Sequence, residues 1–168
     1  MDYWDEVNKA RKALEGWSDL AEQYGVRVCY HTHSQRCLGL NAGTLAHMIR
    51  GFDPKRIGAF LDAGHLRAEG EEFDVAVSIV REHLSMVAVK DFLLERVDRE
   101  NHGAVRRRVV EAGQGMCDWT AIFAELKRIG FDGLISIHCE FEVDESQRMD
   151  AIRREVAFFK QLKEKTGA

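Results

Sequence analysis

The sequence lacks the features that mark membrane and secreted proteins. It has no apolar run of the roughly 18 residues that a membrane-spanning helix needs. Its start, residues 1–9, is too acidic and polar for a secretory signal. We therefore expect a cytoplasmic protein that has no membrane partner.

Positive charge is not in excess either. The 24 lysines and arginines are outnumbered by 28 aspartates and glutamates, which gives a formal net charge of -4. A chain with this balance has no broad attraction for phosphate backbones, so we expect no nucleic-acid partner. The basic run Arg106, Arg107 and Arg108 is a local exception that fits a solvated loop face better than a phosphate clamp.

Cysteines are few and far apart. Cys29, Cys37, Cys117 and Cys139 match neither the close pairs of a zinc motif nor a compact disulfide framework. Reduced thiols, which are typical of a cytosolic protein, are the better interpretation. The sequence also has no glycine-rich nucleotide loop and no serine nucleophile elbow.

The sequence does contain an alternation of helical patterns and short apolar runs. With 168 residues, of which 45% are hydrophobic and 31% charged, it fits one globular domain over residues 1–168. Apolar residues at three- and four-residue steps predict helices over 2–24, 45–50, 74–83, 119–129 and 145–163. Four apolar runs predict strands within 26–31, 57–62, 86–91 and 134–140. Residues 94–115 are expected to form an irregular loop, rich in charge and glycine.

The spacing of these runs indicates a parallel sheet of the barrel type. The first three runs begin at residues 26, 57 and 86, close to the roughly 30 residues that one strand and helix unit takes in a (β/α) barrel. Four units make half of such a barrel, so the predicted α/β fold is a partial TIM-type barrel of four parallel strands with outer helices. Its open edges invite pairing. We expect completion by a homodimer or other oligomer, or by N-terminal sequence outside this chain.

The runs end in residues that bind metals or move protons. Because parallel strands gather their carboxyl ends on one face, side chains that are far apart in sequence converge there. We therefore expect the following residues to be neighbours: His31, His33, Asp62, His65, Lys90, Asp91, His138 and Glu140.

Four motifs at these positions resemble one family. They are YHTHS at 30–34, FLDAGH at 60–65, VAVKD at 87–91, and GQG followed by DW within 113–119. In this order they are similar to the sugar phosphate isomerase and epimerase branch of the xylose isomerase-like TIM barrel superfamily. The resemblance covers nearly the whole chain, but only strands five to eight of the family's barrel.

The resemblance implies one divalent metal, held by residues on those four strands. Where the family has glutamate, aspartate, histidine and glutamate, this chain has His31, Asp62, Ala88 and His138. Only Asp62 is unchanged, and Ala88 is not a ligand. The remaining ligands His31, Asp62 and His138 form a set that suits zinc, manganese, iron or cobalt. Magnesium is a further candidate.

Lys90 and Glu140 are the candidate catalytic groups. Strand alternation puts Glu140 on the face of His138, where it could be a fourth ligand or the base. Lys90 faces inward if Ala88 does, and could then polarise a carbonyl near the metal. The alternative for Lys90 is a structural pair with an acid such as Asp62 or Asp91.

The other histidines divide into two groups. The resemblance puts His33 near the substrate, and His65 either contacts a sugar hydroxyl or only fills its loop. His47, His83 and His102 are expected at the surface. For the ligands themselves, the alternatives are a structural histidine at a strand end and an aspartate that caps the next turn.

The resemblance implies a metal-dependent isomerase or epimerase of carbohydrate metabolism, or a related lyase. It would abstract the proton alpha to the carbonyl of a keto-sugar or related polyol. The alternative is a non-catalytic or degenerate barrel fragment that binds a partner chain or a sugar. The DNA-repair endonuclease branch of the superfamily is disfavoured, because it requires more histidines and a basic groove.

Overall fold

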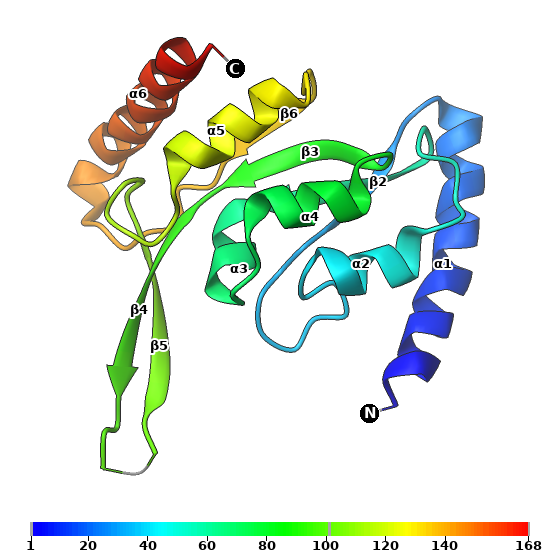
Figure 1. Cartoon of the computed structure of the whole chain (residues 1–168), viewed down its shortest axis with the longest axis horizontal. Helices are drawn as coiled ribbons and strands as arrows, with labels where there is room; N and C mark the ends of the chain where they lie inside the picture. Colours follow the sequence, from blue (N-terminus) through cyan, green and yellow to red (C-terminus); the bar gives the residue numbers. More distant parts are fainter. Residues whose placement is uncertain (1, 101, 168) are drawn as a thin grey trace.

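The computed structural model describes residues 2–100 and 102–167, and its centre is a four-stranded parallel sheet (Figure 1). The sheet order is β1-β2-β3-β6, and every neighbouring pair is parallel. The strands are β1 (Val28–His31), β2 (Ile57–Asp62), β3 (Leu84–Val89) and β6 (Leu134–Ile137). The predicted α/β class with parallel strands is confirmed.

Helices alternate with these strands, and local signals set their ends. The helices are α1 (Tyr3–Tyr24), α2 (Ala42–Ile49), α3 (Ala63–Ala68), α4 (Phe73–Val80), α5 (Trp119–Arg128), the 3₁₀ helix η1 (Glu145–Gln147) and α6 (Arg148–Thr166). Asp2 caps α1 by accepting from two backbone N–H groups, and Gly25 ends it in the left-handed conformation. The short helix α3 was not predicted, and Asp62 caps it.

The core lies between the helices and one face of the sheet. In β2, Ile57, Ala59 and Leu61 are fully buried members of the main hydrophobic cluster. The alternate residues of the strand, including Phe60 and Asp62, point to the opposite face because successive side chains alternate. The strand ends on that opposite face carry the polar residues.

Residues 94–115 do not form the irregular loop that we expected. They contain most of a β-hairpin, in which β4 (Asp91–Val97) pairs antiparallel with β5 (Ala104–Val110). Both strands contain valine, and β4 also contains phenylalanine, residues that favour strands. In Figure 1 the hairpin projects away from the rest of the molecule.

Four of the residues assigned to the surface lie there, and His83 does not. His47 and His102 are exposed, as are Arg106 and Arg108 of the basic run. The prediction for His83 was wrong: the residue is buried, and its Nδ1 is 2.8 Å from the Ile57 carbonyl oxygen. Helix α4 ends at Val80, so His83 lies in the turn that enters β3 and packs against the neighbouring strand.

β1 and β6 are the two edge strands, and neither has a strand on its outer side within the described residues. Exposed apolar side chains lie near both edges. Leu134 of β6 is 69% exposed, and Trp17, Leu20 and Tyr24 of α1 are also exposed. None of the described helices is long and apolar enough to cross a membrane.

Candidate metal centre

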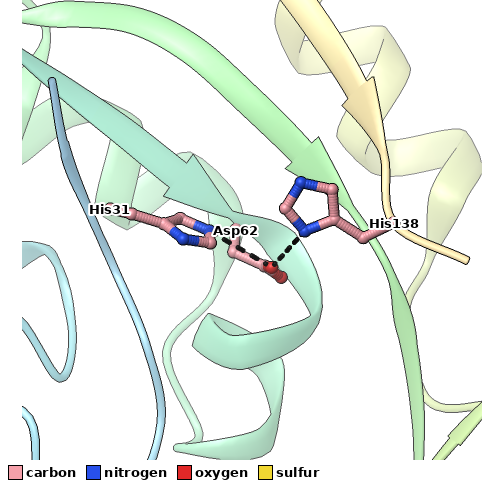
Figure 2. A group of neighbouring side chains, drawn as sticks. All are labelled: His31, Asp62 and His138. Atoms are coloured by element: carbon pink, nitrogen blue, oxygen red, sulfur yellow. Dashed lines mark ion pairs between the residues drawn. The ribbon is translucent and has the colours of Figure 1, made fainter. Parts of the chain in front are cut away.

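His31, Asp62 and His138 converge at the carboxyl end of the sheet (Figure 2). His31 is the last residue of β1, Asp62 is the last of β2, and His138 directly follows β6. One ligand atom from each residue lies within 4.8 Å of the others. Parallel strands therefore bring together three residues that are separated by more than 30 positions in the chain.

Asp62 is the centre of this group. Its Oδ2 lies 3.4 Å from His31 Nε2 and 3.7 Å from His138 Nδ1. These three atoms are buried and have no hydrogen-bond partner. Buried polar atoms in proteins normally have such a partner, so these three face one another across a gap that a ligand could bridge.

Neighbouring groups hold the three side chains in place. Thr32 Oγ1 accepts a hydrogen bond from the Asp62 backbone N–H at 2.9 Å, and the His31 ring stacks on Phe60. His138 Nε2 is hydrogen-bonded to Ser136 Oγ at 3.1 Å. If Nε2 donates in this bond, Nδ1 keeps a free lone pair directed at Asp62, as a metal ligand requires.

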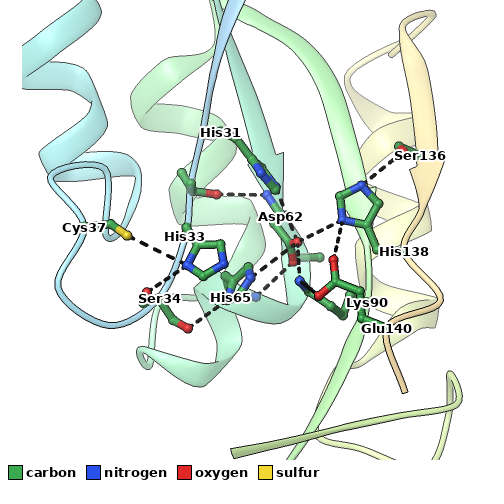
Figure 3. Close-up of polar contacts among 12 residues, drawn as sticks. His31, His33, Ser34, Cys37, Asp62, His65, Lys90, Ser136, His138 and Glu140 are labelled. Carbon is green, nitrogen blue, oxygen red and sulfur yellow. Dashed lines mark hydrogen bonds and ion pairs between the residues drawn. The ribbon is translucent and has the colours of Figure 1, made fainter. Parts of the chain in front are cut away.

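Lys90 and Glu140 lie beside the group, on the side of His138 (Figure 3). Lys90 donates to Glu140 Oε2 at 2.8 Å, and its Nζ is 3.6 Å from Asp62 Oδ2. The Lys90 side chain is 1% exposed and that of Glu140 is 55% exposed. Lys90 therefore faces the site and also pairs with the acids Glu140 and Asp62.

His33 and His65 line the opposite side of the group. Their rings are 3.9 Å apart between centroids. His65 is buried, and its Nδ1 is 2.8 Å from Ser34 Oγ. Its Nε2 is buried without a hydrogen-bond partner, 3.9 Å from Asp62 Oδ2.

Burial and charge act in opposite directions on the acids of the site. Burial by itself raises the pKa of the Asp62 carboxyl. His31, His65 and Lys90 together lower this pKa by more than burial raises it, so the net shift is downward. The pKa of Glu140 is likewise raised by burial and lowered more strongly by Lys90. Both carboxyl groups are therefore held in the charged form that binds cations.

Two of the histidines, His65 and His138, are held in the neutral form. Burial lowers the pKa of His65 to about 4, although Asp62 opposes the shift. Burial also lowers the pKa of His138, again against the attraction of Asp62. Neutral imidazole is the form that binds a metal.

The donor set fits a divalent metal. Two imidazole nitrogens and one carboxylate oxygen are unpartnered and mutually close, and such a set leaves coordination positions open for water or substrate. Ala88, at the position where the resemblance implies a further ligand, is fully buried beside Asp62. No side chain on β3 replaces that ligand directly, and Lys90 brings a positive charge nearby instead.

Asp91 is the one predicted neighbour that does not join the site. Its carboxylate turns away from Asp62 and binds the loop between β5 and α5. Sequence reasoning also missed the polar supports Thr32, Ser34 and Ser136. Two of these lie inside the YHTHS motif, where their alternation with His31 and His33 was the only available signal.

Known proteins with similar sequence or structure include sugar-modifying enzymes. An inosose dehydratase from Lacticaseibacillus casei is 25% identical over 146 residues, covering 81% of this chain and 48% of that protein. Among solved structures, the 3-keto-D-glucoside 4-epimerase YcjR from E. coli aligns with a TM-score of 0.75 and 18% identity, over 96% of this chain and 56% of that one. The structure described as IOLI protein with a binding zinc atom aligns with a TM-score of 0.76 and 20% identity, over 99% of this chain and 59% of that one.

The chain spans about half the length of the curated relatives that it matches. At these identities the likeness to solved structures shows the fold. A family model described as xylose isomerase-like TIM barrel matches residues 3–162. The chain therefore belongs to the xylose isomerase-like TIM barrel family.

Proposed function

We propose that this chain is a metal-dependent isomerase or epimerase, or a related lyase, that acts on a keto-sugar or related polyol. The observation that carries the proposal is the set of three buried, mutually facing and unpartnered ligand atoms on His31, Asp62 and His138. Relatives described as an inosose dehydratase and a sugar epimerase support the substrate class. Both chemistries can begin with removal of a proton alpha to a carbonyl.

His31, Asp62 and His138 would hold the divalent metal. When bound, such a metal supplies Lewis-acid stabilisation for negative charge on the substrate's carbonyl oxygen. Zinc, manganese, cobalt and magnesium are the candidates, and the zinc in the structure of a family relative makes zinc the first to test. Thr32 and Ser136 would keep the ligands oriented.

Glu140 is proposed as the base and Lys90 as the group that polarises the carbonyl. The Glu140 side chain is half-exposed at the mouth of the site, so its carboxylate can reach a bound substrate. Its lowered pKa keeps it ready to accept a proton at neutral pH. Lys90 Nζ, held between Glu140 and Asp62, adds positive charge where negative charge would develop.

His33 and His65 are proposed to bind substrate hydroxyl groups. Their rings, 3.9 Å apart between centroids, lie across the site from Lys90 and Glu140 (Figure 3). The unpartnered Nε2 of His65 is available to a polar group of the substrate. Ser34 would set the orientation of that nitrogen through its bond to Nδ1.

We propose that residues 1–168 form a single domain equivalent to half of a (β/α) barrel. The two open edges, the four parallel strands and the match to about half of each relative support this interpretation. Completion would come from a homodimer or other oligomer, or from four further strands outside this chain. The four free cysteines support a cytoplasmic location.

Metal content per chain tests the proposal. Untagged protein purified without chelator should carry close to one metal ion per chain by mass spectrometry. The double variant His31→Ala, His138→Ala should carry none. The matched control His47→Ala, His102→Ala removes two exposed histidines and should keep the metal. Metal retained by the first variant, or absent from the unmodified protein, would contradict the proposed centre.

Activity is tested by proton exchange with solvent. Incubation with D-fructose or inosose in deuterium oxide should place deuterium on the carbon alpha to the carbonyl, observable by NMR. Glu140→Gln should abolish this exchange while metal content is unchanged. Exchange that survives in Glu140→Gln would assign the base to another residue.

A non-catalytic sugar- or partner-binding protein is the second candidate. The observation that favours it is Ala88, which occupies the position of a family ligand and cannot bind a metal. That protein would bind D-fructose or inosose by calorimetry without any deuterium exchange. It would also carry no metal.

A further inference from the structure

Asp91 has an unusually complete set of hydrogen-bond donors. Its Oδ1 accepts from the backbone N–H groups of Phe92 at 2.9 Å and Cys117 at 3.1 Å. Its Oδ2 accepts from the backbone of Gly113 at 3.0 Å and Gly115 at 3.1 Å, and from Trp119 Nε1 at 3.0 Å. The residue is 0% exposed. Both carboxylate oxygens are thus saturated, which leaves Asp91 no capacity to act on a substrate.

Four of the five donors come from residues 113–119, in the segment that follows the hairpin, and glycine lets this segment approach. Gly113 has a φ of 86°, which an L side chain rarely adopts. A Cβ atom at Gly115 would collide with the Asp91 carboxylate. The segment with the GQG and DW motif, residues 113–119, therefore binds the Asp91 side chain through its N–H groups. A second buried carboxylate, Glu155 of α6, accepts from the Ala112 backbone at the start of the same loop.

Lys90 precedes Asp91 and lies between β3 and β4. The backbone on its N-terminal side is held because His138 N–H donates to the Val89 carbonyl oxygen at 3.0 Å. The Lys90 carbonyl oxygen packs so closely against Gly64 that a side chain there would collide with it. On the C-terminal side, the bonds of Asp91 to the loop fix the chain. The Lys90 backbone is therefore restrained on both sides.

We propose that Asp91 is a positioning residue, whose bonds to the loop of residues 113–119 hold the buried Lys90 ammonium between Glu140 and Asp62. This inference rests on the proposed function, because Lys90 is useful only at a site that binds the substrate's carbonyl group. The Lys90 side chain has four methylene groups and many rotamers. Its Nζ lies 2.8 Å from Glu140 and 3.6 Å from Asp62, and these contacts are maintained only if the Lys90 backbone does not move.

The position of Lys90 has a measurable effect on cation binding. An ammonium 3.6 Å from Asp62 Oδ2 opposes a metal cation at the same oxygen. A variant that lacks this ammonium, Lys90→Met, should therefore bind metal more tightly. A variant in which the Lys90 ammonium moves away from Asp62 should also bind metal more tightly.

The first experiment measures the exposure of the Lys90 amine. Folded protein is treated with acetic anhydride, and acetylation of Lys90 is followed by peptide mass spectrometry against the exposed Lys12. Asp91→Asn replaces one acceptor oxygen with an NH₂ group that faces N–H donors, which should release the loop. Lys90 should then react faster by about tenfold or more, because local opening becomes easier.

Glu155→Gln is the matched control. It also replaces a buried carboxylate that accepts from this loop, but it bonds the loop to α6 and not to the Lys90 segment. Acetylation of Lys90 should remain close to that of the unmodified protein. Equal acceleration in both variants, or none in Asp91→Asn, would overturn the positioning role.

The second experiment is a double-mutant cycle on metal affinity. Metal-free protein is titrated with Co²⁺, and binding is followed through the visible absorption of the ion. Asp91→Asn should tighten Co²⁺ binding in the native background and leave it unchanged in the Lys90→Met background, because the effect passes through Lys90. An equal change in both backgrounds would assign Asp91 a purely structural role.

The outcomes separate this inference from the proposed function. Absence of Co²⁺ binding in every variant, together with faster Lys90 acetylation in Asp91→Asn, would remove the metal centre and keep the positioning role. If Asp91→Asn does not fold, Trp119→Phe removes one of the five donors and is tested in the same two assays. It should accelerate acetylation of Lys90 in the same direction, and failure to do so would overturn the inference.

Discussion

Asp62 and Asp91 are two fully buried aspartates near the ends of neighbouring strands, and they have opposite surroundings. Asp91 accepts five hydrogen bonds from N–H groups. Asp62 Oδ2 accepts none, and is surrounded at 3.4 to 3.9 Å by His31, His65, Lys90 and His138. Burial and residue type are the same in both cases, so neither property separates a structural carboxylate from a functional one.

The difference lies in whether the fold itself satisfies the carboxylate. A buried charge without compensating donors is costly, and at Asp91 the fold supplies five, four of them from residues 113–119. At Asp62 the fold supplies cationic and titratable neighbours and leaves the contacts incomplete. A site that is to hold an exchangeable ligand must retain such unsatisfied groups, and it does so at some expense of stability.

The largest expected effect on stability is at Asp91. Asp91→Asn leaves several N–H donors facing an NH₂ group in a buried site, and should lower the free energy of unfolding by about 3–5 kcal/mol. Urea denaturation followed by circular dichroism measures the change. Asp118→Asn, at the exposed cap of α5, is the control and should have little effect, because asparagine caps a helix as well as aspartate does. Equal losses in the two variants would contradict the contrast drawn here.

The next effect is the pH dependence caused by His65. Burial lowers its folded-state pKa from the ordinary value of 6.5 to about 4, so the folded protein binds fewer protons than the unfolded chain. The stabilising contribution is fully present above pH 6.5 and is lost as the pH falls towards 4, by about 3 kcal/mol. Urea titrations of metal-free protein at several pH values should show a smaller loss in His65→Gln. An unchanged slope in that variant would assign the acid sensitivity to other groups.

Trp119→Phe should have an intermediate effect. It removes one donor from Asp91 and keeps an aromatic ring in the core against Phe159. The free energy of unfolding should fall by about 2 kcal/mol, the contribution of a hydrogen bond to a charged group. Phe123→Leu, a core substitution away from Asp91, provides a comparison that does not disturb the loop. Only Trp119→Phe should increase hydrogen exchange at Gly113 and Gly115.

The smallest effect on stability is expected at Asp62. Asp62→Asn keeps the cap of α3, since asparagine can still accept from the His65 backbone, and Oδ2 has no hydrogen bond to lose. The free energy of unfolding of metal-free protein should change by less than about 1 kcal/mol. Metal binding should disappear nevertheless. A stability loss as large as that of Asp91→Asn would show that Asp62 is structural.

Much of this arrangement could be predicted from the sequence. Apolar runs located the four parallel strands, and the residues at their ends located His31, Asp62 and His138. These signals are local, because hydrophobic periodicity and strand ends can be recognised within a few residues. The hairpin was missed because its strands carry many charged residues, among them Arg106, Arg107 and Arg108, and this resembled a solvated loop.

The distinction between the two aspartates could not be predicted from the sequence. Asp91 ends an apolar run, as Asp62 does, and four of its five donors lie more than 20 residues further along the chain. Which loop folds back onto which strand end depends on tertiary structure. The supports Thr32 and Ser34 were missed for the same reason, since their partners belong to β2 and α3.

Cys117 belongs to the loop that Asp91 holds, so the reactivity of its thiol reports on the state of that loop. Its backbone N–H donates to Asp91, and its thiol lies 3.8 Å from the carbonyl oxygens of Ala63 and Lys90. Burial, with Asp91 nearby, raises the pKa of the thiol, so the reactive thiolate is scarce while the loop is closed. We therefore expect alkylation of the half-buried Cys117 to be slower than that of the exposed Cys37, and to become faster when the loop opens. The ratio of the Cys117 labelling rate to the Cys37 labelling rate therefore reports on the opening of the loop, and no probe has to be introduced.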